Sequence, residues 1–571
     1  MKLTSIKKFG IIALMGIAVS CGDDFLDKAP IGAATEASLA TNQKGVESLI
    51  IAAYSVVDGF SGWDVGNPWG SAASNWTYGS IAGGDAYKGS ESGDQPDITP
   101  LEIHNADANS PYLESKWNSI YDGIFRVNKA INAISKLTTA TDDWKKQRLA
   151  EMQFMRAHYH FEGKKTFNKL PYIDEKVTEF RVPNDKDIYA NIEADLNAAI
   201  AVLPLKQAEV GRASKGAAQA TLGKVLLFQK KYGPAKAAFD AVIGSNIYTL
   251  APKYHDNFNA ETRNNAEGVW VVQQAVNEGT EGDNGNIGDV LNYPHGGGPG
   301  GCCGFHQPSQ NLVNAFKVDA NGLPLVDTYN DSDVKTDQGI KANEAFTPDA
   351  GSFDPRLDWT VGRRGIPYLD WGNHPGASWI RDQAYGGPYS PKKLVYYKGQ
   401  EGSLTSAAGW TKGYTANNIK LIRYADVLLM AAECEIEVGA VDKARTYVNQ
   451  IRARAANPAG FVKDAAGKDA AKYVVGLYNT PWTDKAVATK AVRFERRIEM
   501  GMEGHRFFDL VRWGIAADEK TKYFAAEGKK RTYLTAGKFT AGKSEYYPIP
   551  RAAIIGSSLN GTATLTQNPG Y

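Results

Sequence analysis

The sequence has few of the residues that build metal centres and disulfide frameworks, with four cysteines and eight histidines among 571 residues. No His/Cys grouping has metal-site spacing, so we expect no bound metal. The acid-rich loops lack the spacing of a known calcium loop, which leaves calcium undecided. A charge excess of either sign is also lacking, with 64 Lys plus Arg against 63 Asp plus Glu. The composition therefore gives no electrostatic basis for binding nucleic acid or an anionic membrane surface.

Catalytic signatures are missing as well. The glycine-rich run at 296–301 lacks the lysine and the following helix of a phosphate-binding loop. No Gly-x-Ser-x-Gly elbow occurs between a strand and a helix. A glycosidase needs two carboxylates around the scissile bond, and the sequence gives no positive sign of such a pair without excluding one. We therefore expect a protein that is not an enzyme and that needs no cofactor.

Long hydrophobic runs are absent too. The apolar run Phe9–Val19 is too short for a membrane helix, which takes about 20 residues. It follows a basic start and precedes Cys21, a pattern typical of a lipoprotein signal peptide at residues 1–20. Cleavage would expose Cys21 for acylation, and residues 21–40 would tether the protein to the membrane through this lipid only. The alternative is an ordinary secretory signal in which Cys21 is incidental.

Helical periodicity is the main pattern that is present. Apolar residues recur at three- and four-residue spacing in four segments, at about 41–57, 112–137, 141–167 and 185–203. Residues 214–244 follow the small/large pattern of a tetratricopeptide repeat, and 420–455 contain a second copy. The sequence predicts a mainly α fold, in which a tetratricopeptide-like scaffold of about four helix pairs carries little β structure.

Two loop-rich regions interrupt this scaffold. They are rich in Gly, Asn, Trp and Tyr, and one contains strand-like pieces such as Gly268–Gln274. Long segments with little regular pattern are usually functional when they are ordered. We expect, after the signal peptide and tether, a scaffold at 41–245 with a ligand loop at 58–109, an insertion at 246–415 on the ligand-binding side, and a last repeat pair with a C-terminal block at 416–571.

Both loop regions combine aromatic rings with polar side chains, as sugar binding requires. Sugar C–H faces stack on rings, and sugar hydroxyls need polar partners. The ligand candidates from this pattern are Trp76, Tyr78, Tyr87, Arg364, Trp371, Trp379 and Tyr385. The alternative interpretation is that these aromatic residues pack the loops onto the core.

The two adjacent cysteines, Cys302 and Cys303, lie in the glycine-rich run. In an oxidising extracytoplasmic setting they could form a vicinal disulfide, which would flatten the backbone and could pad a sugar-binding surface. Two free thiols are the alternative.

Several motifs occur in order along the chain: Arg126–Ala130, Phe154–Ala157, Ile422–Leu429, Arg493–Glu499, Glu503–Leu510 and Gln567–Tyr571. Together they resemble the SusD/RagB family of outer-membrane nutrient-binding lipoproteins of Bacteroidetes. The alternating Arg and Glu residues of the C-terminal motifs invite a catalytic interpretation. We interpret them instead as structural Arg–carboxylate pairs that fix helix ends and loops.

The resemblance implies a lipid-anchored protein on the cell surface, with Asp23 and Asp24 similar to a surface-export signal. Such a protein captures an oligosaccharide or polysaccharide and delivers it to a TonB-dependent transporter of SusC type, acting as a non-catalytic lid. The resemblance adds Asp85 to the ligand candidates, because family members often carry a polar ligand contact there.

The near-neutral charge favours a neutral glycan such as a β-glucan, although Arg363, Arg364 and Arg381 keep an anionic ligand open. The alternatives are a peptide-capturing member of the same family, a surface glycoside-processing enzyme and a scaffold that contacts only a partner protein.

Overall fold

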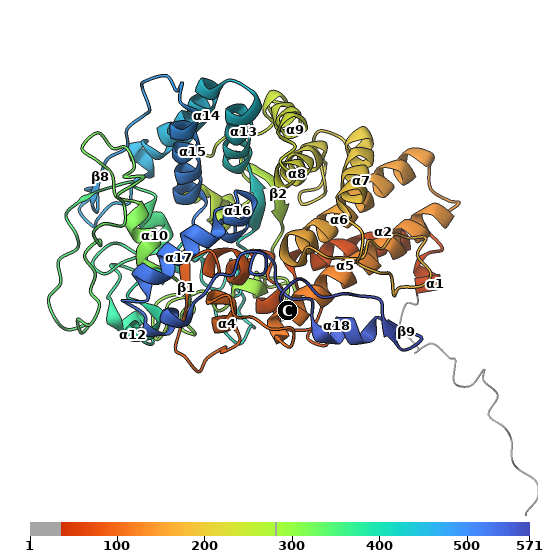
Figure 1. The fold of residues 1–571 in the computed structure, drawn as a ribbon, viewed down its shortest axis with the longest axis horizontal. Helices are drawn as coiled ribbons and strands as arrows, with labels where there is room; N and C mark the ends of the chain where they lie inside the picture. The colour runs from red at the N-terminus through yellow and green to blue at the C-terminus, as the bar shows by residue number, and fades with distance from the viewer. Residues whose placement is uncertain (1–35, 280–281) are drawn as a thin grey trace, which may run out of the picture.

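The computed structural model describes residues 36–279 and 282–571 (Figure 1). The fold is mainly helical, with 44% helix and 7% strand, as predicted. The predicted signal peptide, Cys21 and most of the tether lie outside the described residues. Within the described part of the chain, no helix is long and apolar enough to cross a membrane.

Stacked helices form the scaffold. The helices of its first half are α1 (Glu36–Leu39), α2 (Gln43–Ser55), α5 (Pro111–Lys136), α6 (Asp142–Phe167), α7 (Tyr189–Val202), α8 (Lys215–Phe228) and α9 (Tyr232–Gly244). Those of the second half are α13 (Tyr424–Val438), α14 (Val441–Ala455), α15 (Lys485–Met500), α16 (Arg506–Arg512) and α17 (Ala516–Glu527). From α5 to α9 each helix packs against the next, and α9 then packs against α13. The two predicted repeat units are therefore neighbours in the stack (Figure 1).

The small/large pattern that predicted these units has a direct structural basis. A Cβ on Gly223 in α8 would lie 2.5 Å from the ring of Phe239 in α9, so only a glycine lets the two helices approach this closely. The start of α8 is capped by Ser214, whose side chain accepts a hydrogen bond from the Ala217 N–H. At the end of α7, Leu203 and Pro204 stop the helix.

The insertion leaves the scaffold after α9 and returns at β7. Its strands form short ladders that join distant segments: β1 (Ala86–Gly89) with β3 (Phe305–Pro308), β2 (Gly268–Val272) with β7 (Ile419–Arg423), β4 (Ser352–Phe353) with β8 (Lys472–Tyr473), and β5 (Val361–Gly362) with β6 (Ser390–Pro391). A last hairpin pairs β9 (Ser558–Leu559) with β10 (Thr562–Ala563). The short helices are α3 (Pro68–Ser71), α4 (Ile98–Glu102), α10 (Gln310–Ala315), α11 (Leu357–Thr360), α12 (Gln383–Gly386) and α18 (Arg551–Gly556).

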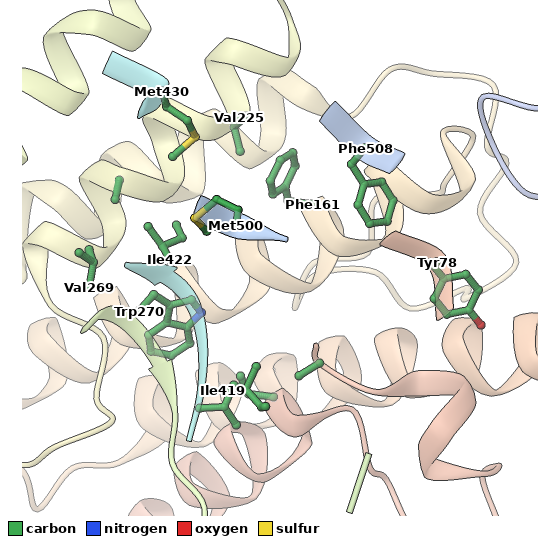
Figure 2. Close-up of a cluster of buried hydrophobic side chains, with 14 of the residues drawn as sticks. Tyr78, Phe161, Val225, Val269, Trp270, Ile419, Ile422, Met430, Met500 and Phe508 are labelled. Atoms are coloured by element: carbon green, nitrogen blue, oxygen red, sulfur yellow. The ribbon is translucent and has the colours of Figure 1, made fainter. Parts of the chain in front are cut away.

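One apolar core joins the scaffold and the insertion. Figure 2 shows Trp270 from β2, Ile422 from β7, Met430 from α13 and Met500 from α15 in the same cluster of buried side chains. Each of these residues is at most 3% exposed. The loops of the insertion are thus anchored on a rigid base.

A buried ionic network lies beside this core, as the structural interpretation of the Arg/Glu motifs predicted. Arg423 donates to the carboxylates of Glu267, Glu499 and Glu503. Arg356 joins Glu499 at 2.8 Å, and both side chains are about 1% exposed or less. Such pairs hold both partners in place, because moving one away would leave an unpaired charge in the interior, which is energetically costly. The network therefore fixes β2, β7, α11 and α15 relative to one another.

Candidate functional site

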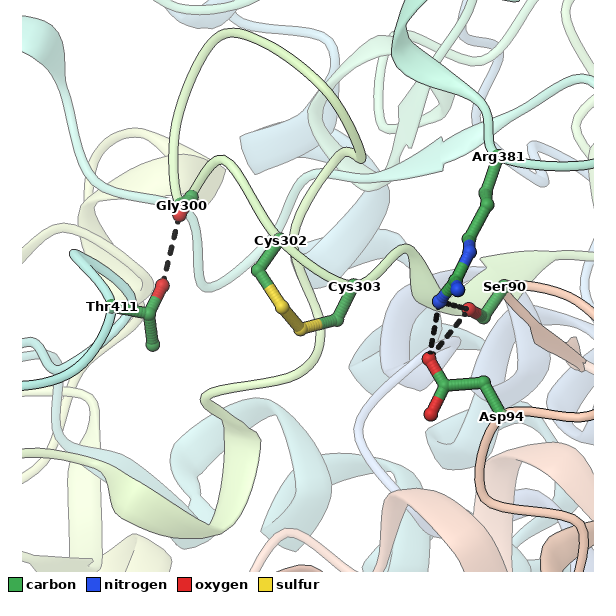
Figure 3. The surroundings of a disulfide bond; sticks show 7 residues. All are labelled: Ser90, Asp94, Gly300, Cys302, Cys303, Arg381 and Thr411. Carbon is green, nitrogen blue, oxygen red and sulfur yellow. Dashed lines mark hydrogen bonds and ion pairs between the residues drawn. A yellow bond between two sulfur atoms is a disulfide. The ribbon is translucent and has the colours of Figure 1, made fainter.

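Three loops of the insertion meet at one surface, which we call the loop cluster: residues 290–304, 366–381 and 395–414. The N–H of His295 donates to the carbonyl of Trp379 (2.9 Å), and the N–H of Gly300 donates to the Tyr396 hydroxyl (3.0 Å). The hydroxyl of Thr411 donates to the carbonyl of Gly300 (2.9 Å), as Figure 3 shows. The first of these loops is therefore held between the other two.

Aromatic rings form the floor of the loop cluster. Tyr293, Tyr368 and Tyr396 are buried together, and half-exposed Trp371 and Trp379 pack against them. The indole N–H of Trp371 donates to the carbonyl of Tyr396 (3.1 Å), while Trp379 meets Tyr368 edge to face at 5.4 Å. Burial raises the pKa of Tyr396 to about 12, so its hydroxyl stays neutral at physiological pH. The two tryptophan rings are thus fixed in orientation before any ligand arrives.

The glycine-rich run lies directly on these rings. Gly298 and Gly300 have φ of 67° and 77°, the left-handed region that favours glycine. A Cβ on Gly298 would lie 2.5 Å from the Trp379 ring, and one on Gly300 would lie 2.5 Å from Cβ of Tyr293. The run ends in Cys302 and Cys303, which the structure joins in a disulfide (Figure 3); Cys303 is buried in the main apolar core and Cys302 packs against it. The backbone of the glycine-rich run therefore packs closely on the aromatic floor.

A polar rim borders the disulfide on the side away from Thr411 (Figure 3). Arg381 donates to the carboxylates of Asp94 and Glu91 (2.6 Å each) and to the Ser90 hydroxyl (3.2 Å). These contacts connect the loop at 58–109 to the insertion. The two loop regions that the sequence singled out therefore meet at one surface.

The predicted ligand contacts in the first loop region require correction. Trp76 and Tyr78 are 0% exposed. The Trp76 indole donates to the carbonyl of Gly288 (3.0 Å), and the Tyr78 hydroxyl donates to the carbonyls of Gly70 and Tyr112. Enclosed rings have no free face for a sugar, so both residues belong to the core.

Asp85 and Tyr87 are buried as well and require the same correction. Asp85 is 2% exposed, and its carboxylate faces the guanidinium of Arg497 at 3.5 Å. Tyr87 is 0% exposed and donates to the carboxylate of Glu527. These side chains connect the first loop region to α15 and α17 instead of presenting polar groups to a ligand.

Two ligand candidates in the insertion, Arg364 and Tyr385, contact other parts of the protein. Arg364 is 9% exposed, and its guanidinium donates to the carbonyls of Lys341, Ala342 and Glu344, so it fixes a turn and is not free for a ligand. Tyr385 is half-buried and lies outside the loop cluster, with its ring stacked on Tyr533 at 4.4 Å. Trp371 and Trp379 are the predicted residues that the structure places in the cluster with half-exposed rings.

One residue of the loop cluster was missed by the sequence-based selection. Trp410 is 56% exposed at the edge of the cluster, beside Thr411. Its ring meets Tyr414 edge to face at 6.2 Å. A signal existed, because Trp410 lies in the short, glycine-flanked segment Gly409–Gly413, whose composition predicts a loop. Trp63, in the first loop region, is exposed to a similar extent, at 54%.

Potential metal ligands are not clustered in residues 36–279 and 282–571. No group of three or more His, Cys, Asp and Glu side chains in this part of the chain could hold a metal ion. The arrangement is that of a rigid aromatic and polar surface on a helical-repeat scaffold, which is typical of a binding protein.

Comparisons with known proteins agree with this class. The model of the SusD family matches residues 266–571, more than half of the chain, and a second model, described as starch-binding associating with outer membrane, matches residues 24–227. The chain belongs to the SusD family. Proteins of this family bind glycans and are not catalysts, so the chain is not an enzyme.

Similar individual proteins include a SusD-like protein of Formosa agariphila, 25% identical over 425 residues that cover 71% of each chain. A laminarin-binding SusD-like protein is 24% identical with a TM-score of 0.63, covering 93% of this chain and all of that one. Surface glycan-binding protein A of Bacteroides thetaiotaomicron, solved with laminarihexaose, is 19% identical with a TM-score of 0.66, covering 92% and 100%. At these identities the solved structures show a shared fold.

Proposed function

We propose that the protein captures a glycan on its loop cluster at the cell surface and delivers it to a partner TonB-dependent transporter of SusC type. The observation that carries this proposal is that Trp371, Trp379 and Trp410 are partly exposed in the loop cluster of a SusD-family chain, with the first two held by packing. The exposed parts of the Trp371 and Trp379 rings can contact sugar C–H groups at little entropic cost, because the orientation of both rings is already held.

The charges around the loop cluster favour a neutral glycan. Arg381 is paired with Glu91 and Asp94, and Lys412 is paired with Glu401. Paired charges give a polyanion little to bind. Two structural relatives carry laminarin or laminarihexaose in their names, which supports a β-glucan as the ligand class.

The placement of the cluster supports a role at the mouth of a transporter. In Figure 1, α12 lies at the lower left of the view and β1 lies left of its centre, whereas α9, α13 and α14 lie at the upper edge. The loop cluster and rim adjoin the former elements through Arg381 and Ser90. A glycan on the loops and a protein partner on the repeat helices would therefore not compete for one surface.

We propose anchoring through lipid on Cys21 at the outer membrane.

The test is affinity electrophoresis and calorimetry of the chain without residues 1–21, which retains every described residue, against a panel of neutral and acidic polysaccharides. We expect retention by a β-glucan, and its loss in Trp379→Ala and Trp410→Ala. Phe180→Ala is the matched control, because it removes a 68% exposed ring in the loop between α6 and α7. Failure of every glycan to bind would refute glycan capture, and binding of extended peptides instead would favour the peptide-capturing alternative.

A further inference from the structure

A second cavity lies apart from the loop cluster. It has a volume of about 560 Å³ and opens between α15, the α16–α17 turn and the loop at 326–331. None of its lining residues comes from the three loops of the cluster. Its volume is in the range that holds a small organic ligand. We call it the C-terminal groove.

The walls of the C-terminal groove carry an excess of cationic groups. Five lining residues are cationic and three are acidic. Lys490 is paired with Asp327 at 2.8 Å, and Arg506 is paired with Glu519 at 3.1 Å. Lys522 lies 3.7 Å from Glu519 and Arg497 lies 3.5 Å from Asp85, so among the lining cations Arg493 on α15 is the one without an ion pair in the described part of the chain.

Arg493 is the least satisfied of these cations. It is half-buried against the Trp513 ring, with its guanidinium carbon 4.9 Å from the ring centroid. Within residues 36–279 and 282–571, no hydrogen bond or ion pair reaches its guanidinium group. The ring is itself fixed, because its indole N–H donates to Glu433 (2.8 Å). The guanidinium donors of Arg493 are therefore positioned without a protein acceptor.

Buried donors without acceptors belong to side chains that line the groove. The Nε of Arg506 and the hydroxyl of Tyr523 have no hydrogen-bond partner in the described structure, although these side chains are only 10% and 5% exposed. The Nε of Arg497 lies 3.5 Å from the Asp85 carboxylate without forming a hydrogen bond. Buried polar groups are normally satisfied, so these unmet donors behind the wall favour an anionic occupant of the groove.

We propose that the C-terminal groove binds a small anionic sugar, whose carboxylate or sulfate group accepts hydrogen bonds from Arg493 and Arg506. Guanidinium groups bind such oxyanions in a planar, two-pronged geometry that lysine cannot reproduce. The half-exposed aromatic side chains of Tyr329 and Trp513 border the space for the sugar ring. This site is separate from the glycan surface proposed above and does not depend on it.

The experiment is calorimetric titration of the chain without residues 1–21 with sodium glucuronate, glucose sulfate, inorganic sulfate and glucose. We expect the two anionic sugars to bind, glucose not to bind, and Arg493→Gln to weaken binding about tenfold or more through loss of a charge-assisted contact. Arg551→Gln, which removes an exposed arginine on α18, is the matched control and should leave binding unchanged.

Several outcomes would overturn the assignment. They are an absence of binding by both anionic sugars, an equal loss in Arg551→Gln, or inorganic sulfate binding as tightly as the sugar sulfate. Thermal unfolding checks that Arg493→Gln is folded, and Arg493→Lys, which keeps the charge, should keep part of the affinity. Trp379→Ala should abolish glucan binding and leave glucuronate binding intact, so the two proposals fail separately.

Discussion

Gly298 lies so close to Trp379 that a methyl group on its Cα would stand 2.5 Å from Cζ2 of the ring. The backbone of the glycine-rich run is thus in direct contact with a ring of the proposed glycan surface. Since Gly298 also has a φ of 67°, both its conformation and its surroundings require glycine.

Gly298→Ala should displace the loop or rotate the Trp379 ring, and so weaken glycan binding. The cost in unfolding free energy should be about 1–2 kcal/mol from the left-handed backbone alone. Gly301→Ala is the matched control, because Gly301 has a φ of 69° and nothing lies within 4 Å of its added methyl. Calorimetry with the glycan should show a larger loss in Gly298→Ala. Equal losses in both variants would mean that the ring contact has no role.

The Cys302–Cys303 disulfide determines how many cysteines can be alkylated before and after reduction. The chain without residues 1–21 contains three cysteines, Cys302, Cys303 and Cys434, and the last is free and buried. Alkylation of the denatured, unreduced protein should therefore modify one cysteine, and alkylation after reduction should modify three, as mass spectrometry can count.

Reduction of this disulfide should hardly change stability. A bond between neighbours closes no chain loop, so it removes little entropy from the unfolded state. We expect the melting temperature to stay unchanged in reductant while glycan affinity falls, because the disulfide restrains the end of the glycine-rich run that packs on Trp379 and Tyr293. A large drop in melting temperature would contradict this.

The buried network predicts a loss of stability in acid. Burial alone would raise the pKa of Glu503, but Arg423 and Lys393 outweigh it and bring the pKa to about 2. Because this folded-state pKa lies below the unfolded value of about 4.5, the stabilisation is complete above about pH 4.5 and is lost as pH falls towards 2. The amount is on the order of 3 kcal/mol. Denaturant titrations between pH 7 and about pH 3 measure it.

Glu503→Gln tests that assignment. It should lower the free energy of unfolding at pH 7 and flatten the decrease in acid, because the titrating group is gone. Glu437→Gln breaks a surface pair with Lys485 and should change stability by less than about 1 kcal/mol. An unchanged acid slope in Glu503→Gln would assign the effect to other carboxylates.

The sequence predicted the scaffold well because its helices carry their own signals. In α8 and α9 the apolar spacing, the Ser214 cap and the Gly223–Phe239 contact are all local or within one repeat. The second unit at α13 and α14 repeats this pattern, so its packing against α9 could be expected from the repeat rule alone.

The ligand candidates in the first loop region failed for the opposite reason. The glycine- and serine-rich composition around Trp76 and Tyr87 is typical of an exposed loop, yet distant segments cover both side chains. The acceptor for Trp76 is Gly288, and that for Tyr87 is Glu527, which are 212 and 440 residues away. Local pattern contains no information about such partners, so exposure could not be separated from burial by composition.

The proposed anchor makes a prediction about location. In cells, the wild-type protein should fractionate with the outer membrane and be cleaved by protease added outside. Cys21→Ser should abolish lipid labelling and release the protein from the membrane fraction, since the proposed anchor is the lipid on that residue. Conversely, membrane retention of the unlabelled Cys21→Ser protein would exclude the lipid as the only anchor.

Trp76 and Trp410 should give opposite results when each is replaced by alanine. Trp76 is 0% exposed, so its removal leaves a cavity and should cost about 3–5 kcal/mol of unfolding free energy. Trp410 is 56% exposed, so its removal should change stability by less than about 0.5 kcal/mol. The glycan affinity should fall when Trp410 is replaced and not when Trp76 is replaced, because only the exposed ring can stack on a sugar. Trp76→Phe keeps most of the buried volume and should bind glycan normally. If folded Trp76→Phe lost glycan binding while Trp410→Ala kept it, the ligand surface would lie elsewhere than the loop cluster.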